Sequence, residues 1–277
     1  MKDYMFSVLI SSYYKDSPLF LEYALESLKN QTLQASEIVF VEDGMLTKEL
    51  YNVLDRYTSL LPIKRISLEE NKGLGNALKV GLEKCTNDIV LRMDTDDICD
   101  TERFVKQVTF MQNNKDIDIL GTWAKDIDYD GKIIGERIFP TSHKDLLNVI
   151  WACPLAHPTI AFRKESIIGI GSYNTGIKRR QDYDLWLRAA TKGLRFANIP
   201  EFLLYYRFTD DYYKKNNLKV AWEQGIMGYN GLRDLNVKSF FPYIGVFSPV
   251  IRALMPKFFV KTFHKLTNRL DPRKKNN

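Results

Sequence analysis

The sequence predicts an α/β fold, a mostly parallel sheet flanked by helices. Two observations carry this prediction. Short apolar runs rich in β-branched residues alternate with stretches whose apolar residues recur at helical spacing, and acidic or hydroxyl side chains directly follow several of these runs. Such alternation is typical of parallel sheets. Ligands of these sheets bind beyond the carboxyl ends of the strands, so the polar side chains fall where a site is expected.

The elements follow one another through the first hundred residues. The first strand is apolar up to two serines, the first helix begins after Pro18, and the second strand ends in Glu42 and Asp43. A glycine-containing helix follows the third strand, and a fourth apolar run ends in acids. We expect strands at residues 6–12, 37–41, 63–68 and 88–93, and helices at 19–28, 48–60, 73–84 and from near 101.

Three carboxylates stand within four residues after the fourth run, at Asp94, Asp96 and Asp97. In an extended segment, Asp94 and Asp96 project to the same side, while Asp97 points away or begins a turn. Oxygen ligands without nearby Cys or paired His favour Mg²⁺ or Mn²⁺ over zinc. The alternative is a solvated acidic turn that caps the helix expected near residue 101.

The order and spacing of several motifs resemble glycosyltransferase family 2 with the GT-A fold, most closely the bacterial enzymes that build surface polysaccharides. The resemblance covers roughly residues 5 to 210. Its motifs are residues 7–13 (SVLISSY), 41–44 (VEDG), 71–77 (NKGLGNA), 94–97 (DTDD), 157–159 (HPT), Arg163 and 181–186 (QDYDLW).

The resemblance implies roles for individual residues. Asp43 hydrogen-bonds the nucleotide base, typically uracil; Asp96 coordinates a Mn²⁺ or Mg²⁺ ion on the diphosphate; and Asp94 contacts the sugar or ribose beside that ion. Asp182 is the general base of a reaction that inverts the anomeric carbon. The implied donor-binding set is Ser11, Tyr13, Asp43, Asn71, Gly73, Asn76, Asp94 and Arg207; the implied acceptor-side residues are His157, Trp151 and Gln181.

Each of these residues also has a structural interpretation. Asp43 before Gly44 can form a turn, and Asp182 can serve as an N-cap or first-turn acid of a helix. His157 beside Pro158 is more often a loop or core residue than a ligand. The glycines after Lys72 do not complete a dinucleotide-binding fingerprint.

The chain departs from the family pattern at two places. Gln181 stands where the family commonly has Glu, and the His that often follows the last strand is absent, because the chain reads Phe208-Thr209-Asp210-Asp211. Either Asp210 substitutes as an oxygen ligand or Arg207 holds the diphosphate directly with its two-pronged guanidinium group.

Composition and charge favour one main domain followed by a distinct C-terminal segment. The 277 residues are 45% apolar, enough for a sizeable core. Residues 238–277 contain nine Lys or Arg and one Asp, a net of +8 against +6 for the whole chain, which leaves about −2 for residues 1–237. We therefore expect a catalytic domain at 1–237, with a nucleotide-binding half at 1–100 and an acceptor half at 101–237. A non-basic catalytic part argues against nucleic acid as a partner.

Aromatic and basic residues are interleaved in the segment 238–277, whose longest uncharged run, 239–251, is too short to span a bilayer. This pattern predicts an amphipathic helical element on an anionic membrane surface. The alternative is a helical layer packed on the core with a solvated basic tail. The three cysteines form no evident pairs, and the N-terminal residues show no leader pattern, so we expect a cytoplasmic enzyme. Together with the C-terminal segment, this predicts a peripheral position on the inner face of the membrane.

The resulting hypothesis is an inverting glycosyltransferase that moves a sugar from a nucleoside diphosphate donor, UDP favoured, to a glycan or lipid-linked saccharide. Two alternatives remain open. A nucleotidyltransferase-like enzyme shares a nucleotide-binding sheet and an acidic metal site, although the region of Asp182 argues against it. A catalytically weakened nucleotide-sugar-binding protein is suggested by Gln181 and the missing His.

Overall fold

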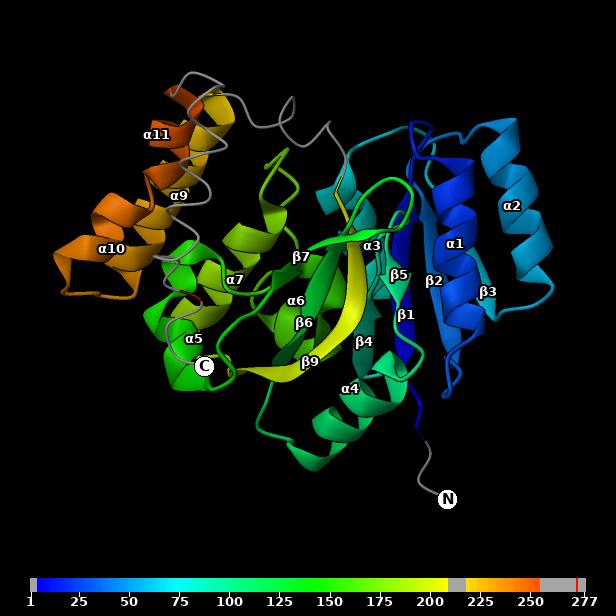
Figure 1. The fold of residues 1–277 in the computed structure, drawn as a ribbon, viewed down its shortest axis with the longest axis horizontal. Helices are drawn as coiled ribbons and strands as arrows, with labels where there is room; N and C mark the ends of the chain where they lie inside the picture. The colour runs from blue at the N-terminus through cyan, green and yellow to red at the C-terminus, as the bar shows by residue number, and fades with distance from the viewer. Residues whose placement is uncertain (1–3, 209–217, 255–272, 274–277) are drawn as a thin grey trace.

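A single twisted sheet runs through the computed structural model, which describes residues 4–208, 218–254 and 273 (Figure 1). Within the described residues the sheet has nine strands, in the order β3-β2-β1-β4-β8-β6-β9-β5, with β7 paired to β6. The strands β3, β2, β1 and β4 are parallel. Mixed pairing follows, since β8 is antiparallel to β4 and β6, whereas β6 and β9 are parallel.

The first half contains the predicted alternation of strands and helices, with boundaries within about two residues of those expected, and one further short strand, β5 (Ile98–Cys99), which the sequence did not predict. Pro18 lies at the first helical position, and the Ser17 side chain accepts a hydrogen bond from the Phe20 N–H, which fixes the start of the first helix. The elements are β1 (Ser7–Ser12), α1 (Pro18–Lys29), β2 (Glu37–Glu42), α2 (Lys48–Thr58), β3 (Ile63–Ser67), α3 (Leu74–Lys84), β4 (Ile89–Arg92), β5 (Ile98–Cys99) and α4 (Arg103–Asn113).

The second half adds strands that extend the same sheet. Strand β9 runs beside β6 for nearly its full length, with irregular register around Trp123. The elements are β6 (Ile119–Ile127), β7 (Ile133–Arg137), α5 (His143–Asn148), η1 (Ile150–Ala152), η2 (His157–Thr159), β8 (Ala161–Arg163), α6 (Lys164–Gly169), α7 (Gln181–Thr191) and β9 (Phe196–Arg207).

Alternate residues of each central strand enter two different cores. Val8 and Ile10 of β1 pack with α1, α2 and α4, whereas Leu9 between them packs with α3 and α7. Both faces of the sheet are therefore buried, which explains why these strands read as continuous apolar runs rather than as alternating patterns.

Three helices form a separate layer at the C-terminal end: α9 (Leu218–Asp234), α10 (Phe240–Gly245) and α11 (Ser248–Leu254). Figure 1 places α10 and α2 at opposite ends of the molecule. Helix α9 packs on α7, where Gly231 lies against Leu187 and Gly228 against Tyr183. In the part of the chain that the structure describes, no helix is long and apolar enough to cross a membrane. Helices therefore occupy part of the predicted C-terminal segment, and the remainder of its basic tail lies outside the described residues, apart from Arg273.

The division of the main domain at residue 100 stays a prediction. Strand β5 pairs with β9, so the end of the first half is tied directly to the last strand of the second.

Candidate active site

The carboxyl ends of β1, β2 and β4 meet at one edge of the sheet, as predicted. The backbone N–H of Asp43 donates to the Ser12 carbonyl at 2.8 Å, and the N–H of Met93 donates to the Leu9 carbonyl at 3.1 Å. These bonds hold the ends of the three strands in register. The loops that carry Tyr13, Asp43 and Asp94 therefore begin side by side.

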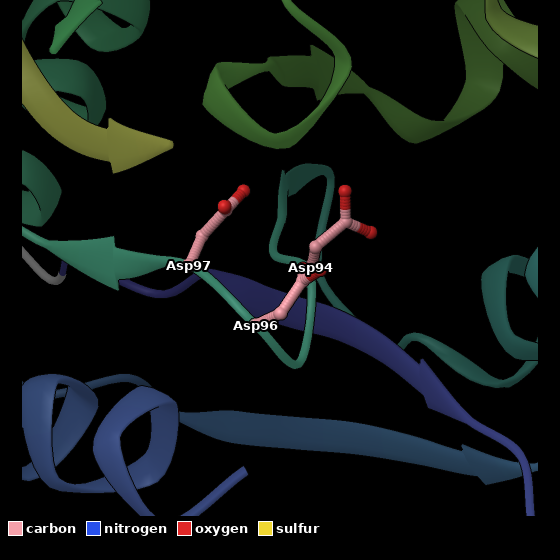
Figure 2. A group of neighbouring side chains, drawn as sticks. All are labelled: Asp94, Asp96 and Asp97. Carbon is pink, nitrogen blue, oxygen red and sulfur yellow. The ribbon is translucent and has the colours of Figure 1, made fainter. Parts of the chain in front are cut away.

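The three acids Asp94, Asp96 and Asp97 form one cluster, in which one carboxylate oxygen from each lies within 4.8 Å of the others (Figure 2). The sequence-based expectation for Asp97 needs correction. Strand β4 ends at Arg92 and residues 95 and 96 form a turn, so the alternation of an extended strand does not apply. The turn brings Asp97 back to the side of Asp94.

Asp97 is the most enclosed of the three, with 1% of its surface exposed. Its Oδ1 accepts the backbone N–H of Arg207 at 2.8 Å, while its Oδ2 is buried with no hydrogen-bond partner among the described residues. Burial, followed by the nearby charges of Asp96 and Asp94, raises the pKa of Asp97 well above its usual value.

An unsatisfied buried carboxylate oxygen beside two further carboxylates is a suitable donor set for a hard divalent cation. Mg²⁺ and Mn²⁺ take oxygen ligands and keep positions for substrate phosphates. Asp96 is the exposed member of the cluster and Asp94 is half-buried, so the cluster opens toward solvent on one side. The residues present therefore fit the divalent metal that the sequence suggested.

Arg207, the last residue of β9, hydrogen-bonds to this acidic turn. Its Nε donates to the Asp96 carbonyl at 2.9 Å, and its Nη1 donates to the carbonyls of Asp128 and Tyr129. With 4% of its surface exposed, the side chain is a structural support of the turn in this structure, and its contact with a diphosphate stays a prediction. Asp210, the alternative, lies outside the described residues.

Asp43 holds the loop that enters α3. Its Oδ1 accepts the Lys72 N–H and its Oδ2 accepts the Gly73 N–H, both at 2.9 Å. The Asn71 side chain donates to the Asp43 carbonyl at 3.1 Å. Gly73 has φ of 87° just before α3, a conformation that favours glycine. Asn76 lies in the first turn of α3. Four of the expected donor-binding residues, Asp43, Asn71, Gly73 and Asn76, thus gather at one helix N-terminus.

Asp16 joins the loop after β1 to the acidic turn, and sequence reasoning missed it. Its Oδ2 accepts the hydroxyls of Ser12 and Thr95, each at 2.9 Å, and the backbone N–H of Tyr13 at 3.2 Å. Burial raises its pKa, although the hydrogen bonds from Ser12 and Thr95 oppose that shift. Tyr13 and Ser11, the expected base-pocket residues, are half-buried beside it. Asp16 therefore fixes the geometry between the loop of Tyr13 and the metal-binding turn.

Asp182 lies in the first turn of α7, next to Gln181. Burial raises its pKa most; Arg180 and backbone hydrogen bonds counteract this, and the charge of Asp94 adds to the rise. The geometric link between this segment and the nucleotide-binding half is made by Gln181, the neighbour of Asp182. Gln181 is buried: it donates to the Ile177 carbonyl at 3.1 Å and packs against Gly75 of α3.

The two remaining acceptor-side residues are His157 and Trp151. His157 is buried, with its Nε2 2.9 Å from the Tyr173 hydroxyl and its ring edge toward Trp186. Burial, then the charge of Arg92, lowers the pKa of His157 well below its usual value. Trp151 is half-buried, accepts the Tyr183 hydroxyl at its carbonyl, and packs on Gly245 of α10.

The site residues assigned from the sequence did not include three that the structure adds. These are Asp97 as a member of the cluster, Asp16 and the fully buried Arg92. Arg92 gave a visible signal, since it is a charged residue inside an apolar strand. Asp16 gave none, because its hydrogen bond with Thr95, which lies 79 residues away, forms only in the fold.

Known proteins resemble this chain throughout the region that carries the site. The sequence profile of Glycosyl transferase family 2 matches residues 7–180. The amylovoran biosynthesis glycosyltransferase AmsE of Erwinia amylovora is 43% identical over 212 residues, 76% of this chain and 79% of that protein. The UDP-Gal:alpha-D-GlcNAc-diphosphoundecaprenol beta-1,3-galactosyltransferase of Escherichia coli is 38% identical over 212 residues, 76% of each chain.

Solved structures share the fold at low identity. TarS 1–349 of S. aureus, in complex with UDP, superposes with a TM-score of 0.66 at 20% identity, over 96% of this chain and 75% of that one. The mannosyltransferase PcManGT of Pyrobaculum calidifontis, in complex with GDP-Man and Mn²⁺, gives 0.62 at 14% identity, over 97% and 81%.

The fold is that of the GT-A glycosyltransferases, as the sequence predicted. The chain belongs to glycosyl transferase family 2, and its curated relatives include enzymes of bacterial surface-polysaccharide synthesis.

Proposed function

We propose that this enzyme transfers a sugar from a nucleoside diphosphate donor, UDP favoured, to a saccharide acceptor in bacterial surface-polysaccharide synthesis, with inversion at the anomeric carbon. The observation that supports the proposal is that Asp43 and the acidic cluster follow the carboxyl ends of β2 and β4, while Gln181, next to Asp182, packs against Gly75 of α3. A relative at 38% identity is named for UDP-Gal and a diphosphoundecaprenol-linked acceptor, which supports a lipid-linked saccharide.

Asp43 would orient the base of the donor. A carboxylate offers about four lone-pair sites, and two of them accept the N–H groups of Lys72 and Gly73. A remaining lone pair can accept the ring N–H of uracil. Because the same carboxylate fixes the loop before α3, correct placement of the base and of that loop depends on one side chain.

Asp182 would take the proton of the acceptor hydroxyl. A general base must be ionised before reaction, and a raised pKa makes its carboxylate a stronger base. Its position in the first turn of α7 supplies backbone N–H groups that keep it oriented and favour the charged form.

Asp94, Asp96 and Asp97 would hold Mn²⁺ or Mg²⁺. Such a cation, when bound, neutralises the charge that develops on the departing nucleoside diphosphate. The residues of the chain supply the fixed frame: Arg207 and Asp16 support the turn from two sides.

The first experiment measures thermal unfolding with UDP, GDP, dTDP and CDP, each with and without Mn²⁺. A ligand at about 100 times its dissociation constant stabilises the folded state by roughly 2.7 kcal/mol. We expect a Mn²⁺-dependent rise in Tm with UDP that is lost in Asp96→Ala. No rise with any nucleotide, with or without anionic lipid present, would contradict the donor site.

Product analysis separates the two alternative functions. A glycosyltransferase given a UDP-sugar and its acceptor releases UDP. A nucleotidyltransferase-like enzyme would release or consume diphosphate, and a nucleotide-sugar-binding protein would gain stability without turnover. Asp182→Ala should retain the nucleotide-dependent Tm shift and lose UDP release, since Asp182 acts on the acceptor.

We infer further that the enzyme is peripheral on the cytoplasmic face of the membrane, where α10 meets an anionic surface. On α10, Phe240, Phe241 and Ile244 are 72%, 81% and 51% exposed, and the exposed residues Lys238 and Arg252 flank them. Exposed aromatic residues beside cations favour the membrane interface. Because Trp151 packs on α10, this surface adjoins the acceptor side of the site.

Flotation with vesicles that contain anionic lipid tests this inference. Phe240→Ser/Phe241→Ser should reduce the bound fraction several-fold. Leu60→Ser, at the 54% exposed Leu60 after α2, is the matched control at the other end of the molecule. Equal binding of all three proteins would contradict a role for α10.

A further inference from the structure

Arg92, the last residue of β4, places a guanidinium group in direct contact with the acidic cluster. The side chain is fully buried, with no exposed surface. Its Nη2 forms a short ion pair with Asp94 Oδ1, and its Nη1 lies 3.5 Å from the Leu9 carbonyl. Its Nε is buried with no hydrogen-bond partner among the described residues. A buried charge without its full set of partners is costly, which calls for a reason.

The acidic cluster that Arg92 contacts explains why a charged side chain is buried here. Three carboxylates with oxygens within 4.8 Å of one another repel strongly, most of all where Asp97 is enclosed. Arg207 supports the same turn, but its guanidinium bonds go to the carbonyls of Asp96, Asp128 and Tyr129. Arg92 instead contacts a carboxylate of the cluster directly.

Two hydrogen bonds hold the backbone of Arg92 in place. The Arg92 carbonyl accepts a 2.7 Å hydrogen bond from Nη2 of the buried Arg103, and the Arg92 N–H donates to the Ile160 carbonyl at 2.7 Å. The backbone is thus held on both sides. The guanidinium of Arg92 places a positive charge against the acidic cluster.

We propose that Arg92 is a positioning residue, the internal counter-ion that fixes Asp94 and keeps the acidic cluster assembled before a divalent cation and the donor arrive. The proposal rests on the metal-binding role of the cluster in the proposed function. Arg92 and a divalent cation then stabilise the same negative charge. Because Arg92 already neutralises part of this charge, a divalent cation without donor binds weakly. The same ion pair keeps Asp94 oriented for the donor.

This arrangement predicts opposite changes in two measurements when the charge is removed. In Arg92→Met, a variant of similar length without charge, Mn²⁺ in the absence of nucleotide should bind about tenfold more tightly, because the cluster becomes more negative. Turnover should fall, because Asp94 loses its fixed orientation. A residue with only a structural role would weaken both or change neither.

Electron paramagnetic resonance titration of free Mn²⁺ gives the affinity without any need for turnover. Arg92→Lys keeps a positive charge without the guanidinium fork, so its Mn²⁺ affinity should stay near that of the wild type while its turnover falls. Arg163→Met is the matched control: Arg163 is a partly buried arginine that pairs with Asp88 at the other end of β4. Its Mn²⁺ affinity should equal that of the wild type.

A folded Arg92→Met protein whose Mn²⁺ affinity is unchanged or weaker would overturn the proposal. A double-mutant cycle of Arg92→Lys and Asp94→Asn, followed by thermal unfolding in metal-free buffer, covers the case in which Arg92→Met does not fold. The proposal predicts that the two losses in Tm do not add; additive losses would overturn it. The cycle contains no metal, so it tests the role of Arg92 independently of metal binding. If the wild type binds no Mn²⁺ even with UDP, that result contradicts the proposed function, and the cycle still decides the role of Arg92.

Discussion

The charge on Asp182 is expected to serve the reaction at the expense of stability. Its pKa is raised in the folded protein, so the folded state binds this proton more tightly than the unfolded chain. The ionised group therefore destabilises the fold at neutral pH, and this effect disappears as the pH falls below the ordinary value of 3.8 for an aspartate.

Replacement of Asp182 by Asn tests both consequences. We expect turnover to fall by about 10²–10⁴-fold, the usual contribution of a general base. At pH 7 the Tm should rise above that of the wild type, and the difference should shrink toward pH 3. Calorimetry across this pH range measures it, with Asp184→Asn as control. Asp184 lies in the same helical turn but is paired with Arg188, so its loss should lower the Tm at pH 7.

Asp43 should affect stability and donor binding together. Asp43→Ala removes two hydrogen bonds from the N–H groups of Lys72 and Gly73. Hydrogen bonds to a charged group contribute about 1.5–3 kcal/mol each, so we expect unfolding to become easier by a few kcal/mol. Urea denaturation and UDP titration are the measurements. An unchanged stability would contradict the role of Asp43 in holding the loop before α3.

At the scale of elements, the contact between α9 and α7 depends on small residues. A Cβ at Gly228 would lie 2.5 Å from the Tyr183 hydroxyl oxygen and 2.6 Å from Val246 Cγ1. Tyr183 lies in the first turn of α7, next to Asp182. The C-terminal layer therefore packs directly on the helix that carries the proposed base.

Gly228→Val should separate α9 from α7. Overpacking of this kind costs about 1–3 kcal/mol of stability, and we expect turnover to fall through displacement of the first turn of α7, with the UDP-dependent Tm shift retained. Glu223→Ala, on an exposed face of α9, is the control and should change stability by less than about 0.5 kcal/mol. Normal turnover in a destabilised Gly228→Val protein would show that the two helices act independently.

At the scale of the whole molecule, the continuous sheet should make residues 4–208 unfold as a unit. The core that packs on α1 also contains Phe104 and Val108 of α4 and Leu204 of β9, so it crosses the expected boundary at residue 100. We expect far-UV and near-UV circular dichroism to report coincident transitions in urea. Two separate transitions would indicate that the halves at 1–100 and 101–237 are independent units.

Local sequence patterns determined the first half of the fold. Apart from the short strand β5, the strands and helices up to α4 follow from apolar runs, helical spacing and caps such as Ser17, all of which act within a few residues along the chain. The same patterns located Asp43 and Asp94 at strand ends. The motif order then led to the family, which the comparisons confirm.

Only the tertiary structure showed the features that depend on contacts between distant parts of the chain. The mixed pairing of β8, β6 and β9 joins residues 40–80 positions apart, and no local pattern specifies it. The turn after β4 places Asp97 with Asp94, because hydrogen bonds from Arg207 and Thr95 override strand alternation. The buried His157, the buried Arg92 and the link from Asp16 to Thr95 likewise depend on partners from distant segments. The sequence by itself therefore determined the class of enzyme and the chemistry of its side chains, whereas charge balance and orientation within the site arise only when the folded chain excludes water and brings these groups together.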